Sequence, residues 1–216
     1  MRRTGFRLFV ASLGFICLAV FCLGFIGFAQ AQDVKPSELT REAILNDPDA
    51  PVGGNPKGDV TIVAFEDYNC TRCKSAEPAL QKLIKDDGHI RLVYKDWPIL
   101  AATSTYGAEL ALAAKYQGKY VAVHNLLMRI PGTGVSKEAM DRALRAAGVD
   151  IDRLGKDLQS HHEEIHALIR RNDAQAVGMG FQGTPVFLIG PYQVAAALDY
   201  DGFKKVVAQA RAQEGK

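Results

Sequence analysis

The sequence predicts an α/β domain in which a block of helices is inserted between two parts of one sheet. A strand, a helix and a strand follow one another from residue 60 to residue 95. Residues 101–180 then show helical periodicity and no strand pattern, and two strands and a helix complete the chain. We therefore expect residues 59–100 and 181–216 to form one α/β domain, with residues 101–180 as a helical insertion.

Residues 1–31 are typical of an export signal. Arg2, Arg3 and Arg7 precede an apolar run from Leu8 to Phe28, and Ala29-Gln30-Ala31 has the small residues of a cleavage site. The run is 21 residues long, so it is also long enough to span a bilayer uncleaved. We expect an exported, periplasmic protein, either soluble after cleavage or anchored in the membrane by residues 8–28.

The composition after residue 31 restricts the function further. The remaining 23 basic and 24 acidic residues give no basic excess for nucleic acid. Only Cys70 and Cys73 remain, because Cys17 and Cys22 lie in the signal. A loop of this size removes little chain entropy when it closes, so a purely structural disulfide is a poor explanation. One such pair is also half of the usual four-cysteine zinc site, so we expect no metal site.

The first elements surround this cysteine pair. Residues 32–58 are polar and rich in proline and glycine, so we expect a lead-in arm with at most a short helix. Residues 60–65 read VTIVAF and predict a strand, and residues 89–95 predict a second one. Between them, residues 74–85 have helical spacing, and Pro78 should kink this helix.

The remaining elements follow from capping residues and periodicity. They are a helical stretch over 104–129, a helix to 147 capped by Ser136, a helix toward 177 capped by Asp150, strands over 185–189 and 194–198, and a helix to 212 capped by Asp201.

The position of the cysteine pair at the start of a helix suggests redox chemistry. The positive end of the helix dipole stabilises a thiolate there and lowers its pKa. We expect Cys70 to be the exposed nucleophile and Cys73 to be the resolving thiol that releases a mixed disulfide. Arg72, between them, either favours the thiolate further or points into solvent.

A second motif gives an alternative. Residues 162–166 read HEEIH, and His162, Glu163 and His166 match the H-E-x-x-H pattern of zinc peptidases. Ile169 stands where the extended pattern requires glycine, and no histidine follows His166. We favour a polar helix flank. The zinc peptidase stays open as an alternative function, as does a non-catalytic binding or holdase module.

The segments FEDYNCTRCK, KDWPIL and GFQGTPVFLIG, in this order of elements, resemble the DsbA-type thiol-disulfide oxidoreductases, most of all the ScsC-like branch. The resemblance implies a thioredoxin fold with an inserted α-helical domain. It assigns the redox pair to Cys70 and Cys73, and the proline that is cis in this fold to Pro185. Thr184 would pair through its backbone with the substrate chain.

Two departures from the family pattern concern proton transfer and the direction of electron flow. Ala64 stands where the family has a buried acid. Glu66, on the same strand face, could assist proton transfer at Cys73, paired with Lys95, or could reach solvent. Thr184 replaces the valine of DsbA and resembles isomerases and reductases, whereas Arg72 favours an oxidant. The direction of electron flow stays open.

The resemblance also implies partners. It requires no dissociable cofactor, because the Cys70–Cys73 disulfide carries the electrons. The partners it implies are cysteine-containing exported proteins and a membrane redox protein that regenerates the site. The short, proline-broken arm favours a monomer. A copper-handling role is a variant, since two thiolates suit Cu(I).

Overall fold

The computed structural model describes residues 34–214 of the chain, and the predicted signal and possible anchor over residues 1–31 lie outside them. In this part of the chain, no helix is both long and apolar enough to cross a membrane.

A five-stranded mixed sheet forms the centre of the described chain, in the order β1-β3-β2-β4-β5. Its strands are β1 (Val52–Gly54), β2 (Val60–Glu66), β3 (Ile90–Asp96), β4 (Val186–Ile189) and β5 (Tyr192–Val194). β2 and β3 are parallel, and the other neighbouring pairs are antiparallel. The strand–helix–strand unit expected over residues 60–95 is therefore present, with β2 at the centre of the sheet.

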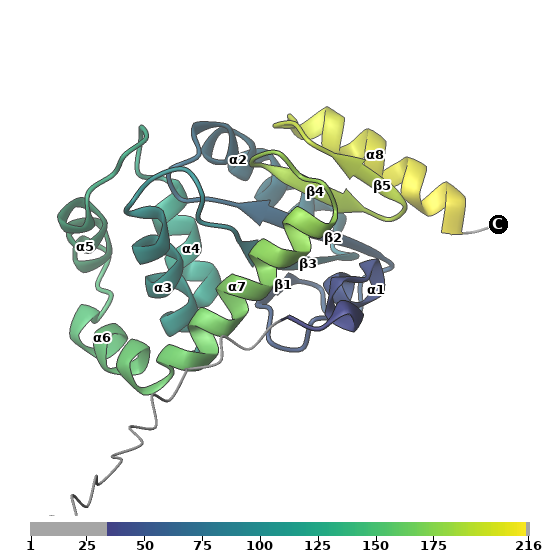
Figure 1. Cartoon of the computed structure of the whole chain (residues 1–216). Coiled ribbons are helices and arrows are strands. Elements are labelled where there is room, and N and C mark those ends of the chain that lie inside the picture. The colour runs from purple at the N-terminus through teal and green to yellow at the C-terminus, as the bar shows by residue number, and fades with distance from the viewer. Residues whose placement is uncertain (1–33, 215–216) are drawn as a thin grey trace, which may run out of the picture. The chain divides into compact units, whose positions relative to one another are not determined.

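Helices cover both faces of this sheet (Figure 1). Helix α2 (Thr71–Asp87) packs beside α8 (Tyr200–Glu214), and α8 contacts β2 and β4. On the opposite face lie α1 (Arg41–Leu45) and α7 (His162–Gly178). Side chains alternate along a strand. Ile62 and Ala64 therefore enter the core between the sheet and α2 and α8, whereas Val63 and Phe65 enter the core on the face covered by α1 and α7.

The helical insertion lies between β3 and β4 in the sequence. Its other helices are α3 (Ser104–Lys115), α4 (Tyr120–Met128), α5 (Lys137–Ala146) and α6 (Ile151–Ser160). Ser136 and Asp150 cap α5 and α6 as expected, each accepting a hydrogen bond from a backbone N–H. The stretch over 104–129 is two helices, because Gly118 adopts a positive φ of 66° between them. The helix expected to run toward 177 is also divided, at His161.

The lead-in arm contains more structure than its composition indicates. The 3₁₀ helix η1 (Pro36–Leu39) precedes α1, and β1 adds an edge strand antiparallel to β3. The two glycines of β1 explain why no strand was predicted there. Gly54 is required by close approach, because a Cβ there would lie 2.4 Å from the carbonyl oxygen of Ile90.

Two C-terminal predictions were displaced. The last strand is Tyr192–Val194 instead of residues 194–198. The N-terminal turn of α8 is capped by Asp199, whose side chain accepts a hydrogen bond from the backbone N–H of Gly202, instead of by Asp201. Pro78 lies inside α2, as expected.

Candidate active site

The cysteine pair lies where β2 leads into α2. Cys70 is the N-cap of α2, and its Sγ accepts a hydrogen bond of 3.0 Å from the backbone N–H of Cys73. The two cysteines are joined as a disulfide. After reduction, the same N–H group and the helix dipole would both stabilise a thiolate on Cys70.

A second loop faces this sulfur from a distant part of the sequence. The carbonyl oxygen of Thr184 lies 3.4 Å from the Sγ of Cys70, and the Thr184–Pro185 peptide bond is cis. Since this loop leads directly into β4, the sheet holds it against the start of α2. The structure thus brings together Cys70, Cys73, Thr184 and Pro185, all predicted site residues.

The exposure of the pair differs from expectation. Cys70 was expected to be exposed, but it is 3% exposed and Cys73 is fully buried. Of the two cysteines, Cys70 is the one with exposed surface, and Cys73 has none.

Two polar residues that the sequence analysis did not single out fix the turn before Cys70. The carboxylate of Asp67 accepts hydrogen bonds from the backbone N–H groups of Asn69, Ile99 and Leu100, at 2.7 to 2.9 Å. The side-chain oxygen of Asn69 accepts one of 2.7 Å from Val135 N–H. The turn is therefore tied to the helical insertion. In the sequence, their position just before Cys70 is what could have indicated this role.

The predicted pairing of Glu66 with Lys95 is wrong. In the parallel register Glu66 is opposite Asp96, so Lys95, one residue earlier, points to the other face of the sheet. There Lys95 Nζ lies 2.5 Å from the carboxylate of Asp47 in the arm, and both side chains are buried. Lys95 therefore stabilises the attachment of the arm and does not contact Glu66.

Glu66 instead belongs to a buried polar group behind the cysteine pair. Glu77 lies one helical turn after Cys73, and its Oε1 is 3.3 Å from His124 Nε2; Glu66 Oε2 is 3.9 Å from the same nitrogen. Burial, together with the charges of Glu77 and Asp96, raises the pKa of Glu66 well above its usual range. The alternative that Glu66 reaches solvent is wrong, since it is 3% exposed.

Asp96 borders this group and should give the protein a distinctive pH dependence. Burial raises its pKa to about 6, although His124, Tyr68 and Tyr120 act to lower it. The folded protein then binds a proton that the unfolded chain releases above its ordinary pKa of about 3.9. The stabilisation is complete below that value and is lost as the pH rises through about 6.

We expect Asp96→Asn to remove this part of the pH dependence, which amounts to at most about 1.4 kcal/mol per pH unit. Asparagine can still accept the 2.9 Å hydrogen bond from the Tyr120 hydroxyl. Urea unfolding of both proteins from pH 4 to pH 7 measures the difference. Parallel stability curves for the two proteins would show that Asp96 does not titrate in this range.

Arg72 is exposed, and its guanidinium has no ion-pair partner in the part of the chain that the structure describes. Of the two expectations for Arg72, the structure therefore agrees with the one in which it points into solvent. Its charge is therefore screened by water, which weakens its influence on the Cys70 sulfur.

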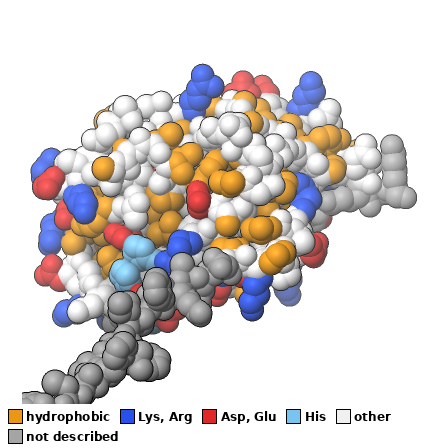
Figure 2. Space-filling model, viewed as in Figure 1, with side chains coloured by type: hydrophobic (Ala, Val, Ile, Leu, Met, Phe, Trp, Pro, Cys, Tyr) orange, Lys and Arg blue, Asp and Glu red, His pale blue; other side chains and the backbone are white. Residues whose placement is uncertain are grey.

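The H-E-x-x-H motif lies at the surface. The side chain of His162 is 56% exposed and contacts Glu163, while His166 Nε2 is 2.9 Å from Glu109. Figure 2 shows histidine side chains gathered at one place on the surface. Within residues 34–214, the only three potential ligands that converge are Glu66, Glu77 and His124. No third ligand therefore joins His162 and His166, and the peptidase alternative has no support.

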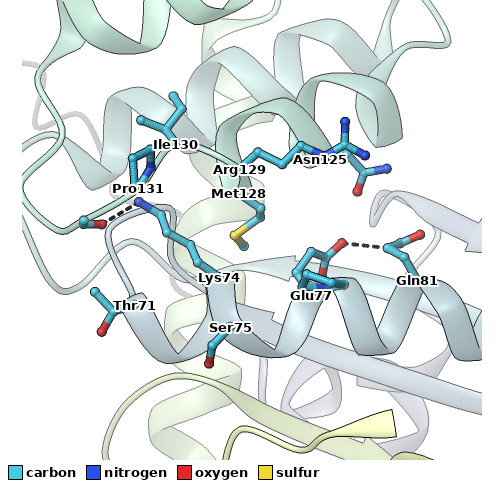
Figure 3. Close-up of a pocket in the computed structure, with 12 residues that line it drawn as sticks. Thr71, Lys74, Ser75, Glu77, Gln81, Asn125, Met128, Arg129, Ile130 and Pro131 are labelled. Carbon is cyan, nitrogen blue, oxygen red and sulfur yellow. Dashed lines mark hydrogen bonds between the residues drawn. The ribbon is translucent and has the colours of Figure 1, made fainter.

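A cavity of about 480 Å³ lies beside the cysteine pair, between α2 and the end of α4 (Figure 3). Its wall includes Thr71, which follows Cys70, and the apolar side chains of Pro78, Met128 and Ile130. Lys74 crosses it at one side, where its Nζ donates a hydrogen bond of 2.8 Å to the carbonyl of Gly132. The cavity can hold an apolar side chain near the start of α2.

The family model described as thioredoxin matches residues 46–209. A thioredoxin-like oxidoreductase from Silicibacter pomeroyi is 40% identical, with a TM-score of 0.74 over 80% of this chain and 98% of that chain. The thiol-disulfide exchange protein alpha-DsbA2 from Wolbachia pipientis is 28% identical, with a TM-score of 0.72 over 78% and 90%. The catalytic domain of Proteus mirabilis ScsC, 24% identical with a TM-score of 0.72 over 82% and 96%, shares the fold. The thioredoxin fold with a helical insertion is confirmed.

The chain is also similar to part of several Na⁺/H⁺ antiporters. The Na⁺/H⁺ antiporters NhaA 1 of Salinispora arenicola and NhaA 3 of Salinispora tropica are 29% and 31% identical over 159 and 168 residues. The match covers 69% of this chain but only 24% of each antiporter. The chain thus spans about a quarter of the length of these relatives.

Proposed function

The chain belongs to the thioredoxin family, and we propose that it is an exported thiol-disulfide oxidoreductase that exchanges disulfides with cysteines of other exported proteins. One observation carries the proposal. The Cys70–Cys73 disulfide caps α2, receives the Cys73 N–H on the Cys70 sulfur, and faces the Thr184–Pro185 loop at 3.4 Å. These are the requirements for a sulfur that alternates between disulfide and stabilised thiolate.

The exchange proceeds in two steps. A substrate thiolate attacks the Cys70 sulfur, which breaks the Cys70–Cys73 bond and leaves the electron pair on Cys73 as a thiolate. A second substrate thiolate then attacks the substrate sulfur of this mixed disulfide, and Cys70 leaves as a thiolate. Two electrons pass from the substrate to the protein. In the reverse direction Cys70 is the attacking thiolate and Cys73 the resolving one.

The surroundings of Cys70 suggest how the substrate is held. Thr184 would pair through its backbone with an extended substrate chain whose cysteine approaches Cys70. The neighbouring cavity would receive an apolar substrate side chain, because Pro78, Met128 and Ile130 line it. Binding through backbone and apolar contacts would accept many sequences, which suits an enzyme that acts on unfolded exported proteins.

Export and regeneration complete the proposal. Residues 1–31 have the pattern of an export signal, and a periplasmic thioredoxin-like protein from Salmonella enterica is 27% identical to this chain over 94% of its length. No dissociable cofactor is needed, since the disulfide carries both electrons. A membrane redox partner would restore the starting state after each cycle, and the protein would act as a monomer.

Two substrates in parallel test the function and its direction. A reduced, unfolded protein reports oxidation, and the same protein with scrambled disulfides reports isomerisation. We expect the purified full chain to accelerate at least one of these reactions with turnover in a glutathione buffer. The proposal fails if neither reaction is faster with the protein than with glutathione alone.

A further inference from the structure

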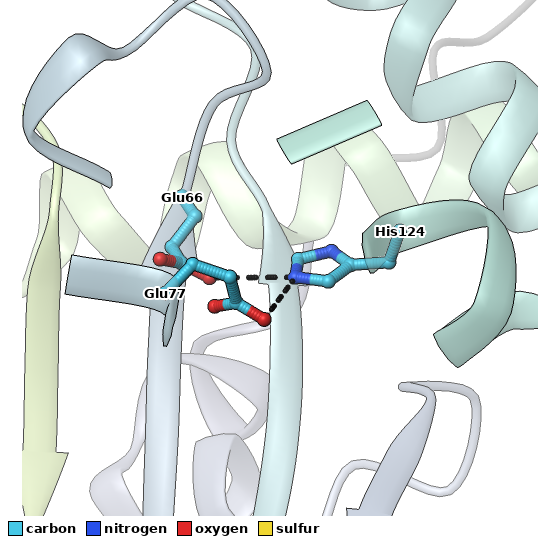
Figure 4. Close-up of side chains that lie close together, drawn as sticks. All are labelled: Glu66, Glu77 and His124. Atoms are coloured by element: carbon cyan, nitrogen blue, oxygen red, sulfur yellow. Dashed lines mark ion pairs between the residues drawn. The ribbon is translucent and has the colours of Figure 1, made fainter. Parts of the chain in front are cut away.

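Three ionisable side chains from separate elements converge behind the redox pair (Figure 4). Glu66 is the last residue of β2, Glu77 lies in α2 one turn after Cys73, and His124 comes from α4. Their nearest ligand atoms all lie within 4.8 Å of one another. All three are at least nine-tenths buried, with exposures of 3%, 5% and 1%.

Each of these three side chains has at least one polar atom without a hydrogen-bond partner. Both carboxylate oxygens of Glu66, one oxygen of Glu77 and the Nε2 of His124 are buried and unpaired within the described residues. An unpaired buried polar atom costs about 1–3 kcal/mol, and more when it is charged. Four such atoms within one buried group indicate that the folded protein holds something there, although the Glu77 oxygen nearest to His124 is Oε1, which Gln81 binds.

We propose that Glu66, Glu77 and His124 bind one divalent metal ion, with Zn²⁺ as the ion that fits them best. One imidazole nitrogen and two carboxylates are a ligand set that Zn²⁺ accepts, with bonds of roughly 2.0–2.2 Å. In a tetrahedron such bonds place the ligand atoms about 3.3–3.6 Å apart. The observed separations from His124 Nε2 are 3.3 Å to Glu77 and 3.9 Å to Glu66. The third separation, between the two carboxylates, is within 4.8 Å, so the two carboxylates would move toward the ion when it binds.

The neighbours of the three ligands also suit a metal site. The Tyr68 hydroxyl lies 3.0 Å from Nδ1 of His124, so it can accept the proton on that nitrogen and leave Nε2 free to bind the ion. Gln81 donates a hydrogen bond of 2.8 Å to Oε1 of Glu77 and holds this carboxylate in place. The ion would also neutralise the two buried carboxylates, which a water molecule would not do.

This site is separate from both metal motifs considered from the sequence. It uses neither the cysteine pair, whose thiolates would suit Cu(I), nor the surface histidines His162 and His166. The spacing of Glu66, Glu77 and His124 in the sequence is not typical of metal ligands. The packing of α4 against α2 brings Glu77 and His124 together. An ion here would lie one helical turn from Cys73 and would favour the thiolate of the reduced protein.

Metal content of the oxidised full chain tests the proposal. With the Cys70–Cys73 disulfide intact, and with Cys17→Ser and Cys22→Ser in the signal segment, no thiolate can bind the ion. The ligands are buried, so the chain is unfolded in denaturant, refolded with excess ZnCl₂ and dialysed before the zinc is counted by mass spectrometry. We expect one retained Zn²⁺ per chain and a higher Tm than for protein refolded in chelator.

Matched substitutions locate the ion. Glu66→Gln and His124→Gln should each weaken Zn²⁺ binding at least tenfold, while His166→Gln, the same change at a surface histidine beside Glu109, should leave it unchanged. Glu66→Gln removes a buried carboxylate that has no hydrogen bond, so this variant should fold without metal, and circular dichroism verifies it. The proposal is wrong if the wild type retains no Zn²⁺, if folded Glu66→Gln retains it fully, or if His166→Gln loses it.

Discussion

Replacing Cys73 with alanine will leave the protein trapped as a mixed disulfide with its substrate, whereas replacing Cys70 with alanine will abolish exchange. Cys70 is the cysteine that keeps contact with solvent and lies 3.4 Å from the Thr184 carbonyl, while Cys73 is fully buried. An incoming thiolate or disulfide therefore reaches only Cys70. Without Cys73 the first bond still forms, but nothing within the protein resolves it.

The expected loss of turnover is about a thousandfold or more for Cys70→Ala, because the remaining groups have no chemistry for sulfur transfer. Non-reducing electrophoresis after incubation with a cysteine-containing peptide or its disulfide measures the adduct. Cys73→Ala should give a stable adduct, and the Cys70→Ala protein, which keeps a buried Cys73, is its matched control. If the Cys70→Ala protein formed as much adduct through Cys73, the assigned roles of the two cysteines would be contradicted.

Replacing Asp47 with alanine will destabilise the protein by about 3–5 kcal/mol, which corresponds to a fall in Tm of roughly 6–20 °C. Burial acts to raise the pKa of Asp47, but Lys95 and Arg171 outweigh it and hold this pKa below its usual value. The carboxylate is therefore charged and bound by two cations, with Arg171 donating hydrogen bonds of 2.7 and 3.0 Å. Removal of Asp47 leaves the fully buried Lys95 ammonium without its ion-pair partner.

Two comparisons isolate this effect by thermal unfolding. Lys95→Met should cost less than Asp47→Ala, because Asp47 keeps its contact with Arg171. Asp59→Ala removes an exposed carboxylate from Arg211 and should cost less than about 1 kcal/mol. Equal costs for Asp47→Ala and Asp59→Ala would show that the arm is not held by this buried ion pair.

The order of elements and the redox pair could be predicted because their signals are local. A run rich in β-branched residues predicts the central strand, and helical spacing after the two cysteines predicts α2. Ser136 and Asp150 lie at helix N-caps, the positions that their side chains favour. The loop that faces the cysteine pair was predicted because its Gly-Thr-Pro segment resembles a family motif, and not from a local rule. Its position 3.4 Å from the Cys70 sulfur is a tertiary fact.

The interactions that the sequence did not reveal all depend on strand register and packing. Lys95 does not pair with Glu66, because the parallel register places the two residues on opposite faces of the sheet. The arm residue Asp47, which Lys95 contacts instead, is 48 residues away in a segment without periodicity. Likewise the hydrogen bonds of Asp67 and Asn69 reach residues up to 66 positions away, and no local pattern specifies such partners.

The equilibrium between the full chain and a series of glutathione redox buffers tests the central claim most directly. We expect one two-electron transition of the Cys70–Cys73 pair, with a reduction potential between that of thioredoxin, about −270 mV, and that of DsbA, about −120 mV. A value near the upper limit indicates a disulfide donor, and one near the lower limit an isomerase or reductase. A potential below about −300 mV, as in structural disulfides, or failure to form the disulfide would contradict the account.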